Sequence, residues 1–139
     1  MGKFFRNILQ SLNINKMTSI YILRLLKGKF YVGKSKKPIS RIRQHFNMRG
    51  SRWTRKYHPL EIVKIVNNCD GFDEDKWTKI YMDKYGIDNV RGGSFCSLEL
   101  KNEEIKYLER SIRGATDSCF ICGGKHFVSN CPYKGSFAT

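Results

Sequence analysis

Two parts of the chain hold the short, dense runs of apolar and β-branched residues that are typical of strands. Residues 17–26 read MTSIYILRLL, and residues 27–29, KGK, then offer a tight turn before residues 30–33, FYVG. A further run, LEIVKIVN, spans residues 60–67. The pattern predicts a β-hairpin followed by a third strand.

Three other segments have the apolar spacing or the end signals of helices. The first spans residues 40–48 and follows Pro38, a residue that suits the first turn of a helix. The second spans residues 73–85, with acidic residues in its first turn and Gly86 as its stop. The third spans residues 102–112, which are acidic near the start and basic near the end.

The order of these elements is two strands, a helix, a strand and two helices. It indicates a small α+β domain with a three-stranded antiparallel sheet flanked by helices. With 139 residues, the chain has room for one compact domain and a minor appendage. We assign residues 1–16 to an N-terminal extension spaced for a short helix, residues 17–113 to the main domain, residues 114–118 to a linker, residues 119–131 to a cysteine-rich segment and residues 132–139 to a tail.

The basic residues are concentrated in the first part of the chain. The formal net charge is +14, and residues 1–60 hold fifteen Lys and Arg and no Asp or Glu, which gives them +15. The other residues hold eleven basic and twelve acidic side chains, a net charge of −1. A solvated surface usually mixes both signs. A basic segment with interspersed aromatic rings instead favours a polyanionic partner, so we expect nucleic acid.

The same composition bears on the compartment. No apolar run has the length that spans a bilayer, and residues 1–16 lack the hydrophobic core and cleavage site of a signal peptide. The five cysteines are odd in number and three of them are clustered, which suits metal ligation in a reducing compartment better than disulfides. We expect a soluble, intracellular protein with no membrane partner, and a nuclear location or a viral origin stays open.

Several polar side chains of the predicted hairpin and the following helix can reach one site. Tyr21 and Tyr31 lie on the two arms of the hairpin, and the right register would place both phenols on one face of the sheet. Arg41 and His45 are four positions apart, so they share one face of the helix. Arg donates a planar, permanently charged fork to phosphate oxygens, and His exchanges protons near neutral pH. Taken singly, each pair is explained as well by packing or solvation.

Taken together, these residues resemble the core of the GIY-YIG nuclease family. Residues 19–21, SIY, and residues 31–33, YVG, resemble its two tripeptides, with the tyrosines ten positions apart, and residues 41–45, RIRQH, follow them. Ser19 replaces the first glycine and Val32 the second isoleucine. Likeness to some viral members extends to residues 51–60, SRWTRKYHPL, and residues 85–94, YGIDNVRGGS.

The resemblance implies an endonuclease that hydrolyses phosphodiester bonds with one divalent cation, Mg²⁺ or Mn²⁺. In the family, the tripeptides lie on paired strands, the arginine lies on the next helix, and a glutamate from a later helix holds the cation. The family pattern implies that Tyr21 is the general base and that Arg41 stabilises the pentacovalent state. It also implies that Tyr31 and His45 orient the water or the phosphate.

The metal-holding glutamate is assigned by its place in the chain. Glu74 is the expected ligand because it lies in the first turn of the helix after the third strand, where the family places it. Asp75 is one residue away and would serve the same chemistry. The cluster formed by Asp73 and these two residues is also explained by complementing the helix dipole. Asn89 is a further candidate for an auxiliary polar role.

A second constellation lies near the C-terminus. Cys119, Cys122, His126 and Cys131 are spaced C-x2-C-x3-H-x4-C, which is enough for a closed tetrahedral zinc site. This spacing resembles the CCHC zinc knuckle of nucleic-acid-binding proteins, with one residue fewer between the second cysteine and the histidine. Since all four positions are filled, the expected zinc ion is structural.

These observations lead to two hypotheses from different classes. The first is a metal-dependent endonuclease acting on nucleic acid, with DNA favoured over RNA, whose zinc knuckle adds affinity for the substrate. The alternative is a catalytically inactive nucleic-acid-binding protein on the same fold, which Ser19 and the open choice of the metal-holding carboxylate favour. Coating of nucleic acid by charge alone would leave the spacing of the tyrosines, Arg41 and His45 unexplained.

Overall fold

The computed structural model describes residues 18–117, 119, 122–126 and 130–133. The chain divides into two compact units, Met1–Glu99 and Leu100–Thr139. The predicted N-terminal extension with its short helix, residues 1–16, lies outside the described residues, as do residues 134–139 of the predicted tail. Within the described ranges, none of the helices combines the length and the apolar character that crossing a bilayer requires.

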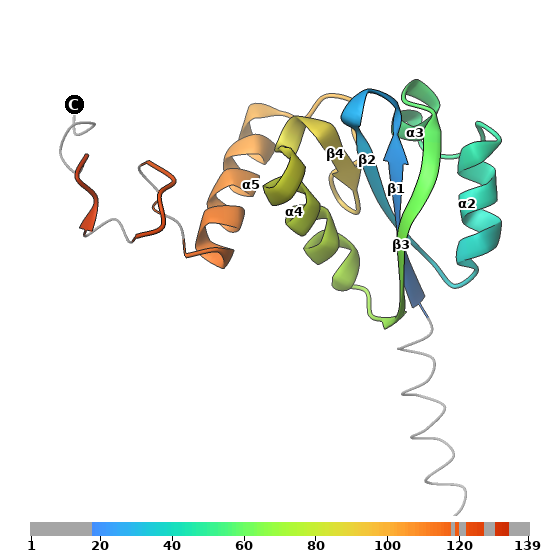
Figure 1. The fold of residues 1–139 in the computed structure, drawn as a ribbon, viewed down its shortest axis with the longest axis horizontal. Coiled ribbons are helices and arrows are strands. Elements are labelled where there is room, and N and C mark those ends of the chain that lie inside the picture. The colour runs from blue at the N-terminus through green and yellow to red at the C-terminus, as the bar shows by residue number, and fades with distance from the viewer. Residues whose placement is uncertain (1–17, 118, 120–121, 127–129, 134–139) are drawn as a thin grey trace, which may run out of the picture. The chain divides into compact units, whose positions relative to one another are not determined.

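The first unit is built on a mixed sheet, shown in Figure 1. Its strands are β1 (Thr18–Leu25), β2 (Phe30–Ser35), β3 (Pro59–Cys69) and β4 (Val90–Gly92). The order across the sheet is β3-β1-β2-β4. β1 pairs antiparallel with β2 and β3, whereas β4 pairs parallel with β2. The α+β class is confirmed.

The prediction of a three-stranded antiparallel sheet is wrong in strand number, because the sheet has four strands, and the fourth, β4, pairs parallel. β4 holds only three residues, valine, arginine and glycine, so no alternation of apolar and polar positions marks it in the sequence. Tertiary contacts hold it instead. Arg91 is buried, lies over the Trp53 ring and donates to the carbonyl oxygens of Ser97 and Leu98.

The register of the hairpin places its key side chains on one face. Tyr21 is opposite Gly33, and Leu23 is opposite Tyr31, so both tyrosines and Leu23 point to the same side of the sheet. Between the strands, the chain turns through the 3-10 helix η1 (Leu26–Gly28), which ends in two residues with positive φ. The expected hairpin and its shared face are therefore present.

Two helices cover the face that holds the tyrosines. α2 (Pro38–Phe46) begins at the proline and ends two residues before the end of the predicted segment 40–48, and α3 (Arg52–Lys56) follows it. The core on this side also contains Leu25, Ile42 and Trp53. α3 was not predicted, since five residues are too few for a periodic pattern, but Ser51 caps it by accepting a hydrogen bond from the Thr54 backbone.

The opposite face is covered by α4 (Asp73–Tyr85), as Figure 1 shows. Its Tyr81 and Tyr85 rings pack on Phe30 of β2. The helix has the predicted bounds, and Gly86 ends it with a φ of 98°, a conformation that glycine adopts without strain. The 3-10 helix η2 (Ile87–Asn89) then leads into β4.

The second unit contains α5 (Asn102–Ala115) and the described residues of the cysteine-rich segment. α5 begins at the predicted residue and is three residues longer than the predicted segment. Glu104 accepts a hydrogen bond from the Lys101 backbone at the start of the helix. Leu108 is the buried residue of this helix.

Candidate active site and metal centre

The two tyrosines of the hairpin lie close together and are buried. Tyr21 is 1% exposed and Tyr31 is 9% exposed, and their ring centroids are 6.3 Å apart. The pleat of β1 and β2 causes this proximity, because residues paired through Tyr21↔Gly33 and Leu23↔Tyr31 are diagonal neighbours on one face. The shared face that the sequence predicted thus brings the two phenols to one place.

His45 of α2 completes this group. Its Nε2 atom lies 2.8 Å from the Tyr21 hydroxyl, and its ring centroid lies 4.8 Å from that of Tyr31. On the other side of the ring, Nδ1 lies 2.9 Å from Oγ1 of Thr54. His45 is completely buried, so it is held by contacts on both of its nitrogens.

Two glycines make room for these rings. A Cβ atom at Gly33 would lie 2.4 Å from the Tyr21 hydroxyl oxygen, and one at Gly50 would lie 1.9 Å from His45 Nδ1. Any larger residue at either position would therefore displace a ring of the site. The glycine of the second tripeptide is explained by this close approach of Tyr21.

Arg41 supplies positive charge to the same group. It lies one helical turn before His45 on α2, is partly buried and donates to Gln44 Oε1 at 2.6 Å. Its charge lowers the pKa of Tyr21, Tyr31 and His45, so it lies within electrostatic range of all three groups. The guanidinium is thus available beside the tyrosines for an anionic substrate.

Burial dominates the proton affinities of this group. It raises the pKa of Tyr21 well above that of a free phenol and also raises that of Tyr31, and the neighbouring Glu74 raises both further while Arg41 opposes the rise. Burial also lowers the pKa of His45 to about 4, with Arg41 acting in the same direction. At neutral pH the two phenols and the imidazole are consequently uncharged.

Glu74 lies in the first turn of α4, next to the end of β2. Its side chain is 16% exposed, and Oε1 lies 3.9 Å from Lys34 Nζ. Burial raises the pKa of the carboxyl group, Lys34 opposes this, and Asp75 adds to it. A partly desolvated carboxylate is less stable as an anion, and an added cation would restore that stability.

Asp75 is occupied by a different contact. Its carboxylate accepts hydrogen bonds from the Ser94 backbone at 2.8 Å and from Ser94 Oγ at 2.9 Å. Gly93, with a φ of +54°, allows this approach, because a Cβ there would lie 2.0 Å from Asp75 Oδ1. Asp75 therefore joins the start of α4 to the loop after β4.

Asn89, the candidate for an auxiliary role, is used in the packing of η2. Its Oδ1 accepts from Lys29 Nζ at 2.8 Å, and its Nδ2 donates to the Tyr85 carbonyl oxygen at 2.7 Å. Lys29 itself lies over the Trp53 and Tyr57 rings. These contacts explain Asn89 as a residue that holds η2 against the rest of the first unit.

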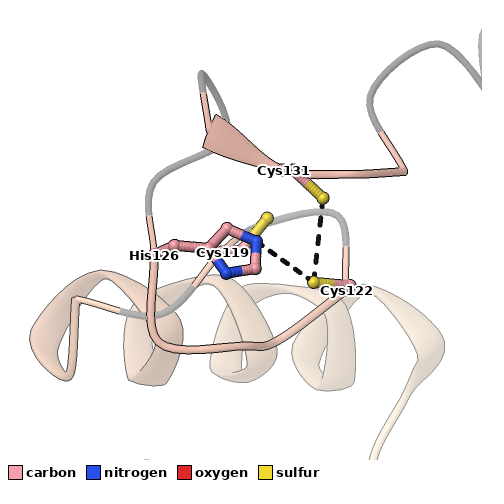
Figure 2. Close-up of side chains that lie close together, drawn as sticks. All are labelled: Cys119, Cys122, His126 and Cys131. Carbon is pink, nitrogen blue, oxygen red and sulfur yellow. Dashed lines mark hydrogen bonds between the residues drawn. The ribbon is translucent and has the colours of Figure 1, made fainter.

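The four predicted zinc ligands of the second unit lie together, as Figure 2 shows. The ligand atoms of Cys119, Cys122, His126 and Cys131 all lie within 4.8 Å of one another. Cys122 Sγ lies 3.7 Å from Cys131 Sγ and 3.4 Å from His126 Nε2. A tetrahedral zinc ion would place such atoms about 3.5 to 3.8 Å apart, so the cluster fits zinc.

Local backbone geometry shapes this cluster. The Cys119 amide donates to the Gly124 carbonyl oxygen at 2.7 Å, and the Gly123 amide donates to the Cys119 carbonyl oxygen at 2.9 Å. Gly123 has a φ of 77°, and a Cβ at Gly124 would lie 2.8 Å from the His126 ring. The two glycines thus let the short loop close around its ligands.

A family model described as the GIY-YIG catalytic domain matches residues 17–86, half of the chain. The chain belongs to the GIY-YIG family. Neither the comparison with curated proteins nor the comparison with solved structures found a match.

The departures from the GIY-YIG tripeptides are accommodated by the fold. Ser19 is 8% exposed and its hydroxyl donates to Asn67 Oδ1 of β3 at 2.9 Å. The serine hydroxyl at this glycine position therefore has a hydrogen-bond partner and is buried without being left unsatisfied. Val32 is completely buried and keeps an apolar β-branched side chain in the strand.

Sequence reasoning missed the residues behind His45. Thr54 is completely buried against the imidazole, and Ser51 in turn contacts Thr54. Ser51 had a signal, because serine before a short helical segment is a common N-cap. Thr54 had none, since no spacing rule relates it to a residue nine positions earlier on another helix. For Lys34, which lies near Glu74, the sequence predicted only a place among the basic residues of residues 1–60.

Proposed function

We propose that this protein is a metal-dependent endonuclease that hydrolyses phosphodiester bonds in nucleic acid, with DNA as the preferred substrate. The observation that supports it best is the grouping of Tyr21, Tyr31 and His45, with the charges of Arg41 and Glu74 acting on the same phenols. Membership of a nuclease family makes phosphodiester hydrolysis the natural use of this grouping.

Each polar residue of the group has a role in this reaction. Arg41 binds the scissile phosphate and stabilises the negative charge that builds up on its oxygens. Tyr21 takes a proton from the attacking water, with His45 behind it as the partner of its hydroxyl. Tyr31, packed against His45, orients the water or the phosphate.

Glu74 is the residue that would hold the divalent cation, Mg²⁺ or Mn²⁺. Its carboxylate is a hard oxygen ligand, it is partly desolvated, and Asp75 beside it is already bound to Ser94. When bound, the cation polarises the phosphate and neutralises charge at the leaving oxygen. Because a single carboxylate leaves most coordination positions open, Mg²⁺ would keep water and phosphate oxygens as its other ligands.

The charge distribution provides the affinity for substrate. The +15 of residues 1–60 is carried by the part of the sequence that includes β1, β2, α2 and α3, the elements that hold the two tyrosines and Arg41. Exposed Arg43, Arg49, Arg52, Arg55 and Lys56 all belong to this part of the chain. Such a basic region attracts a phosphate backbone without regard to base sequence.

The Cys3His cluster is assigned to structural zinc and to substrate affinity. Its four ligands fill a tetrahedral site, which leaves no open position for catalysis. A zinc-ordered loop of this size adds a second contact to the nucleic acid and so raises the affinity of the whole chain. Bond cleavage is assigned to the first unit alone.

The experiment that tests this function is a cleavage assay on a panel of substrates. Purified protein is incubated with supercoiled plasmid, linear duplex DNA, branched DNA and duplex RNA, each with Mg²⁺, with Mn²⁺ and with excess chelator. We expect cleavage of DNA only with metal. Tight binding without cleavage of any substrate would favour the inactive nucleic-acid-binding protein instead, and preferential cutting of RNA would overturn the assignment of DNA.

A further inference from the structure

A buried chain of hydrogen bonds extends from Tyr21 through His45 to the start of α3. The Tyr21 hydroxyl lies 2.8 Å from His45 Nε2, and His45 Nδ1 lies 2.9 Å from Thr54 Oγ1. Thr54 Oγ1 lies 3.1 Å from the Ser51 carbonyl oxygen and 3.1 Å from Ser51 Oγ. Tyr21, His45 and Thr54 are each at most 1% exposed, so no bulk water interrupts the chain.

The end of this chain sets the direction of its protons. A carbonyl oxygen only accepts, so the single hydroxyl proton of Thr54 is donated to the Ser51 carbonyl. Thr54 Oγ1 then has lone pairs with which it can accept a proton carried on His45 Nδ1. In a neutral imidazole with its proton on Nδ1, Nε2 is free to accept from the Tyr21 hydroxyl.

We propose that Thr54 is a positioning residue that holds His45 in the tautomer with its proton on Nδ1, which leaves Nε2 open to receive the proton of Tyr21. In the reaction, the Tyr21 O–H bond breaks and an Nε2–H bond forms. The Tyr21 oxygen takes a proton from the attacking water, and the resulting hydroxide displaces the leaving oxygen from phosphorus. The leaving oxygen takes a proton from solvent, and the imidazolium later releases its extra proton to solvent.

This arrangement answers a difficulty of the site. A buried phenol is hard to ionise, so Tyr21 acting alone would be a weak base. Burial also lowers the pKa of His45, so the two transfers are coupled: the Tyr21 proton moves to Nε2 as the Tyr21 oxygen takes the proton of the attacking water, and no free phenolate forms. The Nδ1–H group continues to donate to Thr54 in the charged state. The other groups that face this pair are Arg41 of α2 and Tyr31 of β2, while Glu74 of α4 acts on the tyrosines.

The inference rests on the proposed function, but the tautomer of His45 can be measured without any cleavage activity. Nitrogen-15 NMR of the histidine rings reports the tautomer of His45, assigned by loss of its signals in His45→Gln. We expect the Nδ1–H form in the wild-type protein and an Nε2–H form in Thr54→Val, which keeps the shape and removes the acceptor. Thr54→Ser, which restores the hydroxyl, should return the tautomer to the Nδ1–H form.

Single-turnover cleavage by the wild type, Thr54→Val and Thr54→Ser links the tautomer to the reaction. We expect Thr54→Val to lower the rate by about a hundredfold with substrate binding unchanged, and Thr54→Ser to recover most of it. A wild-type His45 found as Nε2–H, or a Thr54→Val rate equal to that of the wild type, would overturn the inference. An Nδ1–H tautomer in a protein that cuts no substrate would instead reject the proposed function and retain the positioning. If Thr54→Val does not fold, the tautomer of His45 in the wild-type protein still tests the inference.

Discussion

Burial of His45 sets how the folded protein responds to acid. A histidine in the unfolded chain binds its proton below pH ~6.5, whereas burial and Arg41 lower the pKa of His45 to about 4 in the fold. Between these two values, the unfolded state binds more protons at this position than the folded state. The free energy of unfolding must therefore fall as the pH falls across this window.

The corresponding prediction compares two proteins at two pH values. Urea denaturation at about pH 7 and about pH 5 should show a loss of stability in acid that is larger for the wild type than for His45→Gln, which has no imidazole to protonate. The difference between the two proteins removes the contribution of the other titrating groups. An equal loss in both would mean that His45 is protonated as readily in the fold as in the unfolded chain.

At this scale, the sequence predicted the groups that recur at fixed spacing. Tyr21 and Tyr31 follow from the two tripeptides, and Arg41 and His45 from one helical face. Glu74 and Asp75 were not separable by spacing, because both lie in the same helical turn. Their different contacts, to Lys34 and to Ser94, depend on tertiary packing that no local pattern encodes.

At the scale of the elements, β1 and β2 hold the site through one close approach. The Tyr21 ring lies over Gly33 because no Cβ occupies that space. Substitution of Gly33 by alanine should therefore push the ring out of place, with a cost of about 1–3 kcal/mol in the free energy of unfolding. The loss of cleavage should exceed what this loss of stability explains, since Tyr21 would also lose its distance to His45.

Gly71→Ala is the matched control for this substitution. A Cβ at Gly71 meets nothing within 4 Å, so its effect on stability should stay within about 0.5 kcal/mol. Chemical denaturation and cleavage rates of the two variants at a temperature where both are folded make the comparison. Equal effects at the two positions would show that the approach of Tyr21 to Gly33 is not required.

The elements differ in how well the sequence predicted them. α4 was predicted with both ends because an acidic first turn and Gly86 mark it. α3 and β4 were missed because their five and three residues are shorter than any period that could reveal them. Both are held by contacts from distant parts of the chain, such as that of Arg91 with the Trp53 ring.

At the scale of the whole molecule, the two units should be separable in their effects. Cys122→Ser removes one ligand of the Cys3His cluster and should reduce bound zinc from about one equivalent to well below it. Elemental analysis of carefully reduced protein measures this. Unfolding of the first unit should be unchanged, because its core contains none of the four ligands.

Binding by this zinc-deficient variant tests the role given to the cluster. We expect weaker affinity for nucleic acid with nearly the same dependence on salt concentration, since the +15 of residues 1–60 remains. Cys69→Ser, at a cysteine outside the cluster, is the control for loss of a thiol. Affinity equal to that of the wild type would remove the proposed role of the cluster in binding.

The most direct test of the account compares Glu74→Gln with the wild type and Asp75→Asn in metal-dependent cleavage. Substrate binding is titrated in parallel. Glu74→Gln keeps the size of the side chain and removes the charge that would hold the cation, so we expect cleavage to fall by about a hundredfold or more with binding nearly intact. Asp75→Asn should retain most of the activity. Loss of activity only in Asp75→Asn would move the metal site by one residue, and full activity in both variants would contradict the account.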